Sequence, residues 1–261
     1  MLDDLGREVH IPAGGARRIV SLVPSLTEAF ATSAPHVLSG ATDWCSHPAD
    51  LDVPRVRGTK NPNLHAIADI APDVVIANQE ENRKLDVERL TGRGIQVWVT
   101  HITTVDEAFY SMRRLFTEVI SSAVPGWLTE AQDAWSAPSS HSPLRVAVPI
   151  WRDPWMVIGA STFSGDLLSR LGLHNIFADA EHNPDGARYP HTDLELIDTD
   201  QVDAVLLPDE PYEFSATDGP EAFTTAPTAL VEGRLITWYG PSLLEARALR
   251  DDVDAKLNAR P

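Results

Sequence analysis

Near its N-terminus the chain reads Arg18-Ile19-Val20-Ser21-Leu22-Val23-Pro24-Ser25-Leu26-Thr27-Glu28. The apolar part of this segment is typical of a buried strand, and Pro24 ends it. Ser25 and Glu28 then have the S-x-x-E spacing of a capping box, which predicts the start of a helix. A strand, a turn and a capped helix in this order form the first part of a β-α-β unit.

The same alternation continues along the first part of the chain. Helical patterns at 64–70 and 83–91 are each followed by a short apolar segment, at 74–77 and 95–99 respectively. Short apolar runs between helices are typical of parallel strands that are buried on both faces. We therefore expect an α/β lobe with a mainly parallel sheet.

The middle of the chain has a different pattern. Residues 105–120 and 125–135 are expected to be helical, with an interruption at Pro125. A Pro- and Ser-rich linker follows at 137–143, and the strand pattern then starts again. This pattern predicts an N-terminal lobe at 1–104, an interlobe helical segment with its linker at 105–142, and a C-terminal lobe at 143–261.

The two expected lobes share a weak internal repeat. Residues 64–80 and 194–210 are related by a constant offset of 194 − 64 = 130, and both contain a helix, a break, an aspartate, a buried strand and an acidic loop. Arg18 and Arg145 each open the first strand of their half. Any two β-α units share some of this pattern, so the repeat favours two similar lobes without excluding chance.

The composition excludes some classes of partner. The 261 residues include 21 Lys and Arg and 38 Asp and Glu, which gives a formal net charge of −17. Nucleic acid and anionic membrane surfaces are bound mainly through Lys and Arg, so neither is an expected partner. Hydrophobic residues make up 43% of the chain, as in globular domains.

The location is predicted from the single cysteine and the first residues. Cys45 alone cannot form an internal disulfide, which excludes a disulfide-stapled secreted scaffold. Charged residues begin at Asp3, without the regions of a signal peptide or a lipid-anchor cysteine, and no apolar run reaches the roughly 18 residues of a membrane span. The sequence as it stands predicts a soluble cytoplasmic protein, and an upstream segment missing from it would make the protein periplasmic or extracytoplasmic.

Aromatic residues gather in the loops that follow the expected strands. Ligands of open α/β sheets bind at the carboxyl ends of the strands. Large rings there favour a cleft that holds a flat or bulky ligand by stacking, although loop tryptophans can also cover the ends of a lobe. The aromatic residues in these loops are Trp44, Trp151, Trp155, Tyr212, Trp238 and Tyr239. Trp238 and Tyr239 would follow a short strand at 235–237.

Three segments, at 18–28, 71–76 and 94–97, resemble the helical-backbone metal receptor family. Its members are the class III substrate-binding proteins of ABC importers and include vitamin B12-binding and siderophore-binding proteins. The resemblance covers nearly the whole chain. It implies two Rossmann-like α/β lobes with mainly parallel sheets, joined by a backbone α-helix, with a ligand cleft between the lobes and little hinge closure.

The chain is most similar to the cobalamin-binding branch of this family. Trp44 falls in the loop where that branch has a ligand-stacking aromatic residue, and Trp238 falls in its C-terminal ligand-contacting loop. The resemblance implies a monomeric, non-catalytic binding protein with no intrinsic cofactor, whose ligand is a corrinoid (vitamin B12-like) or a related metal chelate. A neutral or weakly charged macrocycle suits aromatic loops better than an anionic siderophore, which would need several inward Arg or Lys.

Other functions stay open at this point. The same scaffold could bind a ferric siderophore or haem, or the cleft could house a metal-assisted enzyme. Cys45 and His47 form a C-x-H pair that could supply an axial ligand to cobalt or iron. A partly buried cysteine and a histidine capped by nearby backbone are the simpler explanation. The absence of G-x-S-x-G, Walker A and dinucleotide motifs favours a protein that is not an enzyme.

The candidate ligand-binding residues combine loop aromatics with polar side chains. Arg152 could pair with a ligand carboxylate or with a nearby acid such as Asp153. Tyr189 follows a stretch rich in Gly, Asn and Pro that is typical of a mobile loop. Asn61 and Glu80 lie in segments that resemble a less characterised subgroup of the family. The full set is Trp44, Asn61, Glu80, Trp151, Arg152, Trp155, Tyr189, Tyr212, Trp238 and Tyr239.

Partnership with an ABC importer permease depends on two further positions. Cobalamin-branch proteins dock on their permease through a surface glutamate on each lobe. This chain has His65 at the first position, and residues 239–242, at the second, contain no glutamate. The resemblance therefore implies ligand binding without the docking glutamates of the family, unless other acids such as Glu81 and Glu210 replace them.

Overall fold

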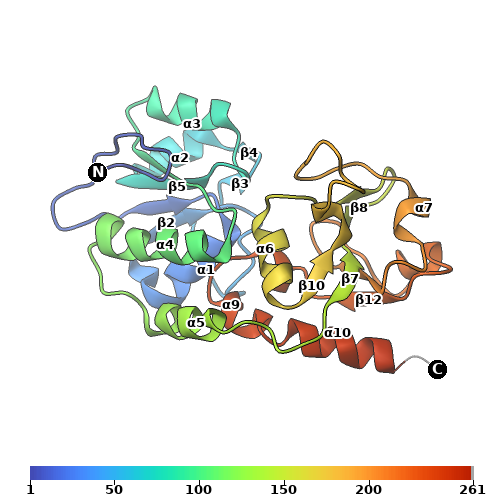
Figure 1. Cartoon of the computed structure of the whole chain (residues 1–261). Coiled ribbons are helices and arrows are strands. Elements are labelled where there is room, and N and C mark those ends of the chain that lie inside the picture. Colours follow the sequence, from blue (N-terminus) through green and yellow to red (C-terminus); the bar gives the residue numbers. More distant parts are fainter. Residues whose placement is uncertain (260–261) are drawn as a thin grey trace. The chain divides into compact units, whose positions relative to one another are not determined.

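The structure, a computed structural model, describes residues 1–259, which form two compact units (Figure 1). The N-terminal unit consists of Met1–Ile102, Asp106–Gln132 and Tyr239–Pro241. The C-terminal unit consists of Thr103–Val105, Asp133–Trp238 and the chain from Ser242 onward. Both units have the α/β organisation that the sequence predicts.

The sheet of the N-terminal unit has four parallel strands in the order β2-β1-β5-β6. They are β1 (Ile19–Ser21), β2 (Leu38–Ala41), β5 (Val74–Asn78) and β6 (Val97–Thr100). The helices are α1 (Pro24–Ser33), α2 (Leu64–Ile70), α3 (Lys84–Thr91), α4 (Val105–Arg114) and α5 (Gly126–Ser136), with a 3-10 turn at Pro35–Val37. A hairpin of β3 (Arg57–Gly58) and β4 (Asn61–Pro62) precedes α2.

Helices cover both faces of this sheet, as expected for buried parallel strands (Figure 1). On one face, Ile67 of α2 and Leu90 of α3 pack in a cluster with Val75 of β5. On the other face, the rings of Phe30 and Phe116 are in contact, with centroids 5.6 Å apart. All five residues of β5 are buried, so this strand contributes to both layers of the core.

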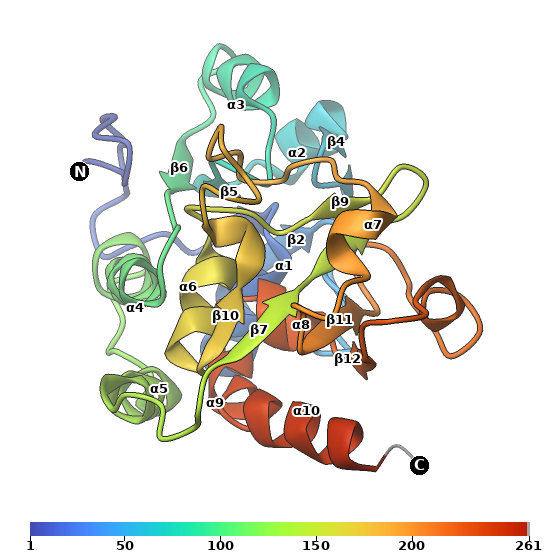
Figure 2. The same cartoon turned by 45° about the vertical axis from the view of Figure 1, so that its right-hand side comes forward.

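The C-terminal unit has a second sheet of four parallel strands, in the order β10-β7-β11-β12. They are β7 (Leu144–Ala147), β10 (Leu173–Asn175), β11 (Ala204–Pro208) and β12 (Thr228–Val231), and a hairpin of β8 (Pro149–Trp151) and β9 (Met156–Val157) follows β7. The helices are α6 (Phe163–Arg170), α7 (Leu194–Ile197), α8 (Arg234–Thr237), α9 (Ser242–Ala246) and α10 (Leu249–Asn258), with 3-10 turns at Ile176–Ala178 and Pro220–Ala222. Figure 2 shows α6 and α7 to either side of this sheet. No helix within residues 1–259 is long and apolar enough to span a bilayer.

The two sheets correspond strand by strand, and the predicted repeat follows this correspondence. β5 begins at Val74 and β11 at Ala204, a separation of 204 − 74 = 130 residues. α2 and α7, which begin at Leu64 and Leu194, have the same separation. The repeat therefore reflects equivalent elements of two similar units.

One polar contact recurs in both units and explains part of the repeat. The Asp73 carboxylate accepts hydrogen bonds from the backbone N–H groups of Arg17 (2.7 Å) and Arg18 (2.9 Å). Asp203 accepts the backbone N–H of Arg145 in the same way, at 2.7 Å. In each unit the aspartate before the central strand therefore holds the start of the neighbouring strand, β1 or β7.

The capping box expected at the start of α1 is wrong. α1 begins at Pro24, with Val23 as the N-cap and no side-chain cap, and Ser25 and Glu28 are buried inside the helix. Proline suits the first helical position because its φ is fixed and its missing N–H needs no partner there. The proline sets the helix start, and the S-x-x-E spacing plays no capping role.

The strand expected at 235–237 is also wrong. These residues belong to the single helical turn α8, and the strand that pairs with β11 is β12. A run of three residues, two of them apolar, is too short to distinguish a strand from a helical turn. Gly233 lies so close to Glu210 that a Cβ atom on it would be 2.5 Å from the Glu210 Cγ, which fixes the backbone before the turn. Trp238 therefore follows a helix.

The helical segment after β6 is built in two parts. α4 is α-helical through Arg114 and continues as one π-helical turn at Leu115–Val119. α5 begins at Gly126, directly after Pro125, where the sequence predicts an interruption. The division between the two units falls within α5, after Gln132. The boundaries expected for the interlobe segment stay predictions.

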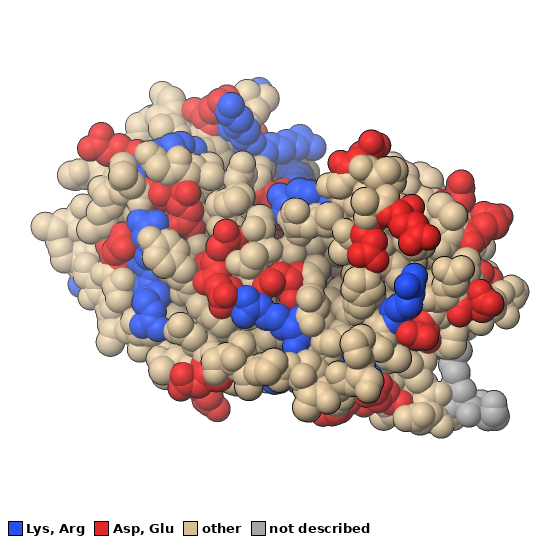
Figure 3. Space-filling model, in the orientation of Figure 1, with Lys and Arg blue, Asp and Glu red and all other residues tan. Residues whose placement is uncertain are grey.

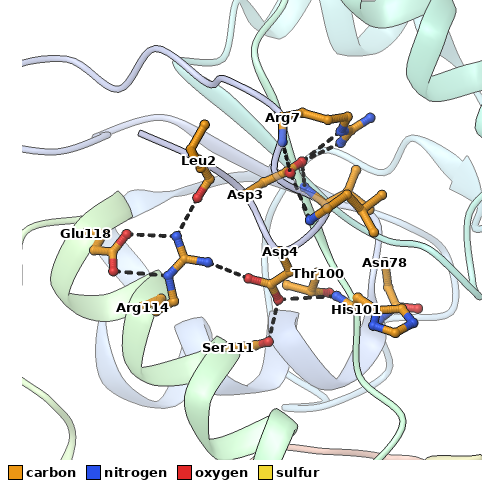
Figure 4. Close-up of polar contacts among 12 residues, drawn as sticks. Leu2, Asp3, Asp4, Arg7, Asn78, Thr100, His101, Ser111, Arg114 and Glu118 are labelled. Carbon is orange, nitrogen blue, oxygen red and sulfur yellow. Dashed lines mark hydrogen bonds and ion pairs between the residues drawn. The ribbon is translucent and has the colours of Figure 1, made fainter.

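The N-terminal residues cover the edge strand β6 (Figure 4). Asp3 accepts a hydrogen bond from the Val99 N–H at 3.2 Å, and the Asp4 N–H donates to the Val99 carbonyl at 3.3 Å. The Asp4 carboxylate also pairs with Arg114 at 2.7 Å. The exposed backbone groups of an edge strand can pair with another chain, so this cover protects the sheet.

Replacement of Asp73 by Ala is expected to lower the free energy of unfolding by about 1–3 kcal/mol, because two backbone N–H groups lose their acceptor. Asp203→Ala should cost less, since Asp203 accepts the backbone N–H of Arg145 alone. Urea denaturation followed by circular dichroism measures both changes. Asp73→Asn keeps an acceptor oxygen and serves as the control. An Asp73→Ala variant as stable as the unmodified protein would contradict this role.

Candidate functional site

Trp44 forms an exposed aromatic surface near the carboxyl end of the N-terminal sheet. It follows β2 and is 67% exposed. Its indole rests on the β3–β4 hairpin, since a Cβ atom on Gly58 would lie 3.2 Å from the indole nitrogen and 2.4 Å from Asn61 Oδ1. A glycine at this position therefore lets both side chains approach the hairpin. The indole is held along one edge while most of its surface faces solvent.

The loop that follows β5 is attached to this hairpin. Asn82 donates a hydrogen bond to the Thr59 carbonyl at 3.0 Å, and Lys60 donates to the carbonyl of Glu80. Burial lowers the pKa of Lys60, and the nearby Glu81 and Glu80 carboxylates oppose this effect. The hairpin and the loop therefore form one connected surface that includes a lysine ammonium.

The C-terminal unit has a cluster of aromatic rings beyond the carboxyl ends of β7 and β11. Trp151 is 48% exposed and makes an edge contact with Tyr212, with centroids 5.7 Å apart. The ring centroid of Phe214 lies 4.6 Å from that of Tyr212 and 6.0 Å from that of Trp155, on which the Phe214 ring stacks. The ring centroid of Phe223 is 5.6 Å from that of Trp155. The inner rings pack on the hydrophobic core. Trp151 is the exposed end of a supported cluster.

Arg152 lies beside this cluster and is paired with acidic residues. Its guanidinium contacts Asp218 and Glu221 and lies 5.6 Å from the ring centroid of Trp155. Tyr212 also donates to Asp218, at 2.7 Å. The hydrogen bond with Glu221 raises the pKa of Arg152 and lowers the pKa of Glu221. The positive charge of Arg152 is therefore balanced within the unit.

A loop at 182–192 borders the cluster and carries Tyr189, which is 37% exposed. The Thr192 N–H donates to the Trp155 carbonyl at 3.1 Å. Asn183 is buried and donates to the Ala187 carbonyl at 2.8 Å. Backbone contacts therefore connect the loop to the hairpin that carries the tryptophans.

Curated proteins that are similar to the chain are named vitamin B12-binding proteins. No protein-family model matches the chain. A vitamin B12-binding protein of Pectobacterium atrosepticum is 24% identical over 246 residues, which cover 88% of this chain and 85% of that protein. A vitamin B12-binding protein of Yersinia pestis is 23% identical over 177 residues, which cover 65% and 63% of the two chains.

Solved structures share the fold over nearly the full length. The periplasmic vitamin B12 binding protein BtuF of Vibrio cholerae matches with a TM-score of 0.72 at 21% identity, covering 93% of this chain and 97% of that chain. The periplasmic haem-binding protein BhuT in complex with two haems matches with a TM-score of 0.74 at 19% identity, covering 94% and 100%. The chain therefore shares the fold of these binding proteins and is similar in sequence to vitamin B12-binding proteins.

Eight of the ten candidate residues reach the surface. The exposed ones are Trp44, Asn61, Trp151 and Tyr189, and the partly buried ones are Glu80, Arg152, Trp155 and Tyr212. Among the candidates, Trp44, Asn61 and Glu80 lie around the β3–β4 hairpin. The candidates between Trp151 and Tyr212 lie around the β8–β9 hairpin.

The expectation of exposed rings at 238 and 239 is corrected. Trp238 and Tyr239 are 7% and 4% exposed, and they follow a helical turn rather than a strand. Tyr239 donates a hydrogen bond to Glu81 at 2.7 Å. Burial and the Glu81 carboxylate raise the pKa of Tyr239 well above its ordinary value. Tyr239 is therefore an interior residue of the N-terminal unit.

Cys45 is enclosed rather than open to a ligand. Its thiol lies 3.0 Å from the Thr27 hydroxyl and 3.2 Å from the Thr42 hydroxyl, and burial raises its pKa. The His47 ring contacts the Ser46 hydroxyl at 3.1 Å. In the part of the chain that the structure describes, no group of three His, Cys, Asp or Glu is arranged to hold a metal ion. The enclosure of Cys45 leaves its thiol closed to a ligand, and the role of His47 as an axial ligand stays a prediction.

The acids suggested as replacements for docking glutamates have partners inside their own units. Glu81 accepts the Tyr239 hydroxyl, and Glu210 accepts the Thr237 hydroxyl at 3.0 Å. His65 is exposed in the first turn of α2. Docking on a permease stays a prediction.

Some residues that support the candidate site were not found from the sequence. Phe223 completes the ring cluster but lies next to a 3-10 turn rather than after a strand. Asp218 and Glu221 are separated from Arg152 by more than sixty residues. No local pattern connects them, so the signal exists only in the folded chain.

A cavity of about 530 Å³ lies elsewhere in the N-terminal unit, beside the N-terminal residues. Its walls include Asp4, His101, Tyr110 and Arg114 (Figure 4 shows three of these). None of the ten candidate residues lines it. The cavity is therefore separate from the surfaces described above.

Asp198 should make the stability of the protein depend on pH. Burial raises the pKa of Asp198. Hydrogen bonds from the N–H groups of Thr224, Ala226 and Thr225 together lower it by more, so the net shift is downward. A carboxylate with a lowered pKa stabilises the fold above its unfolded pKa, about 3.9, and this contribution is lost as the pH falls through the folded value. Asp198→Asn should therefore be less stable at about pH 7 and lose stability less steeply below about pH 4. Urea unfolding across this pH range measures both slopes, and equal slopes would disprove the assignment.

The Cys45 thiol should be unreactive in the folded protein, because it is buried and its raised pKa leaves little thiolate. Ellman's reagent at about pH 8 should react slowly with native protein and at once in urea. The absorbance of the released thionitrobenzoate measures both rates. Rapid reaction with the native protein would show that Cys45 is accessible.

Proposed function

We propose that this protein binds a corrinoid or a closely related metal chelate and catalyses no reaction on it. The observation that carries the proposal is the pair of exposed indoles, Trp44 and Trp151, each beyond the carboxyl ends of a parallel sheet. Ligands of open α/β sheets bind at these ends, and indoles bind flat rings by stacking. The relatives named vitamin B12-binding proteins support a corrinoid as the first choice.

The charges near Trp151 favour a ligand with little negative charge. Arg152 is paired with Asp218 and Glu221, so it offers no excess positive charge to an anion. On the face seen in Figure 3, acidic side chains are spread over both units, with Lys and Arg among them. A polyanionic siderophore would meet repulsion from such a surface. A neutral or weakly charged macrocycle would bind through stacking and apolar burial.

Haem is the second candidate ligand. BhuT, which shares the fold, is described in complex with two haems. Tyr189 is exposed on the 182–192 loop, and a tyrosine phenol is one of the side chains that ligate haem iron. A shift of the haem absorption band on binding, absent in Tyr189→Phe, would favour haem over a corrinoid.

We further propose that the protein delivers its ligand to an ABC importer and acts as a monomer. The solved structures of the same fold are described as periplasmic proteins. We propose the same location for this protein. Cell fractionation tests the location, and size-exclusion chromatography with and without ligand tests the oligomeric state.

Replacement of Trp44 or Trp151 by Ala should raise the Kd for hydroxocobalamin by about 5- to 150-fold, as expected for the loss of one stacking ring. Isothermal titration calorimetry measures the Kd, and quenching of tryptophan fluorescence gives an independent curve. Leu85→Ala and Leu196→Ala remove exposed apolar side chains, one in each unit and outside the candidate surfaces, and should bind as the unmodified protein does.

The same titrations decide between the candidate ligands. Binding of haem but not hydroxocobalamin would replace the corrinoid with haem. No binding of hydroxocobalamin, haem or a ferric siderophore would overturn the proposed function. Unchanged affinity in both tryptophan variants would overturn the stacking mechanism alone.

A further inference from the structure

The segment Tyr239–Pro241 belongs to the N-terminal unit, although the chain before it, up to Trp238, and after it, from Ser242, belongs to the C-terminal unit. The ring of Tyr239 is buried, and its hydroxyl donates to Glu81 at 2.7 Å. The next residue, Gly240, lies so close to Ser25 that a Cβ atom would be 2.9 Å from the Ser25 carbonyl oxygen. The segment is therefore fixed in place by close packing on α1 as well as by the hydrogen bond.

Glu81 lies on the loop between β5 and α3. The backbone of this loop is held from within, because Asn78 Oδ1 accepts the N–H groups of Glu80 (2.8 Å) and Glu81 (3.3 Å). The Glu81 side chain is held from outside the loop by Tyr239. The loop therefore has one anchor in its own strand and one in a segment from the far end of the chain.

This loop in turn holds the tip of the β3–β4 hairpin. Lys60 donates to the Glu80 carbonyl, and Asn82 donates to the Thr59 carbonyl at 3.0 Å. The same hairpin supports the exposed Trp44 indole through Gly58. A chain of direct contacts therefore connects the buried Tyr239 hydroxyl to the exposed aromatic surface.

Lys60 has donors to offer at this surface. An ammonium group has three N–H donors, and the contact with the Glu80 carbonyl uses one. Lys60 is itself an exposed residue on the hairpin that supports Trp44. A flat ligand stacked on Trp44 therefore needs no net charge to be recognised. An oxygen atom at its edge can accept a hydrogen bond from Lys60.

We infer that Tyr239 is a positioning residue for ligand binding: through Glu81 and the 78–82 loop it fixes Lys60 on the hairpin that supports Trp44, and the Lys60 ammonium binds a carbonyl or carboxylate oxygen on the edge of a ligand stacked on Trp44. The ligand contact of Lys60 rests on the proposed function. The positioning role of Tyr239 rests only on the contacts described above. Lys60 is thereby assigned a preference for ring ligands that carry amide or carboxylate substituents.

Removal of the Tyr239 hydroxyl should loosen the loop without emptying the core. Tyr239→Phe keeps the ring and leaves a Glu81 oxygen without this donor, which favours movement of the side chain toward water. Tyr110→Phe is the matched control, because Tyr110 is 62% exposed in the same unit and lies outside this chain of contacts. Glu81→Gln is a second variant, since its amide oxygen can still accept the Tyr239 hydroxyl.

Hydrogen exchange measured by mass spectrometry tests the positioning with no ligand present. In Tyr239→Phe, peptides that cover 57–62 and 78–83 should exchange about threefold faster or more, while the rest of the unit is unchanged. Tyr110→Phe should exchange as the unmodified protein does, and Glu81→Gln should lie between the two. Unchanged exchange in both peptides, or a uniform increase over the whole unit, would overturn the inference.

Ligand affinity tests the role of Lys60 with hydroxocobalamin, which carries amide groups, as the probe. Tyr239→Phe and Lys60→Met should each weaken binding by about 3- to 10-fold, and the double variant should be no weaker than Lys60→Met. If the losses of affinity in the two single variants added up in the double variant, Tyr239 would not act through Lys60, and the inference would be overturned. If the unmodified protein bound none of the chelates, the proposed function and the ligand contact of Lys60 would fail, while the exchange measurement would still decide whether Tyr239 holds the loop.

Discussion

Parallel strand pairing places the loops that carry Trp44, Trp151 and Tyr212 at the carboxyl ends of the two sheets. β1 pairs with β5 from Ile19 opposite Val74 onward, and β7 pairs with β11 in the same sense. In a parallel sheet all carboxyl ends lie at one edge, so loops that are distant in the sequence gather there. Asp73 and Asp203 bind the backbone at the opposite ends of these strand pairs. The recurring aspartate therefore helps to fix the strands whose other ends carry the aromatic loops.

The two units support their exposed indoles in different ways. In the N-terminal unit, Trp44 rests on a hairpin that hydrogen bonds connect to the next loop. In the C-terminal unit, Trp151 is the end of a chain of ring contacts that continues through Tyr212 and Phe214 into the core. Both arrangements hold a large ring before a ligand arrives, so less side-chain freedom is lost on binding.

Features that depend on local pattern could be predicted from the sequence, and features that depend on distant contacts could not. The helix at Leu64–Ile70 and the strand at Val74–Asn78 follow directly from hydrophobic periodicity, and the aromatic loops follow from their place after strands. The failures are short or ambiguous signals, such as Leu235, Ile236 and Thr237, which form a helical turn. Tyr239 is buried and donates a hydrogen bond to Glu81, which lies 158 residues away, and nothing near Tyr239 in the sequence indicates that contact.

The enclosed thiol of Cys45 has a consequence for the conditions in which the protein can work. It is the single cysteine of the chain, and it is completely buried between two threonine hydroxyls. Such a thiol neither needs a reducing environment to stay intact nor offers a partner for disulfide-linked dimers under oxidation. The fold is therefore indifferent to the redox state of its surroundings.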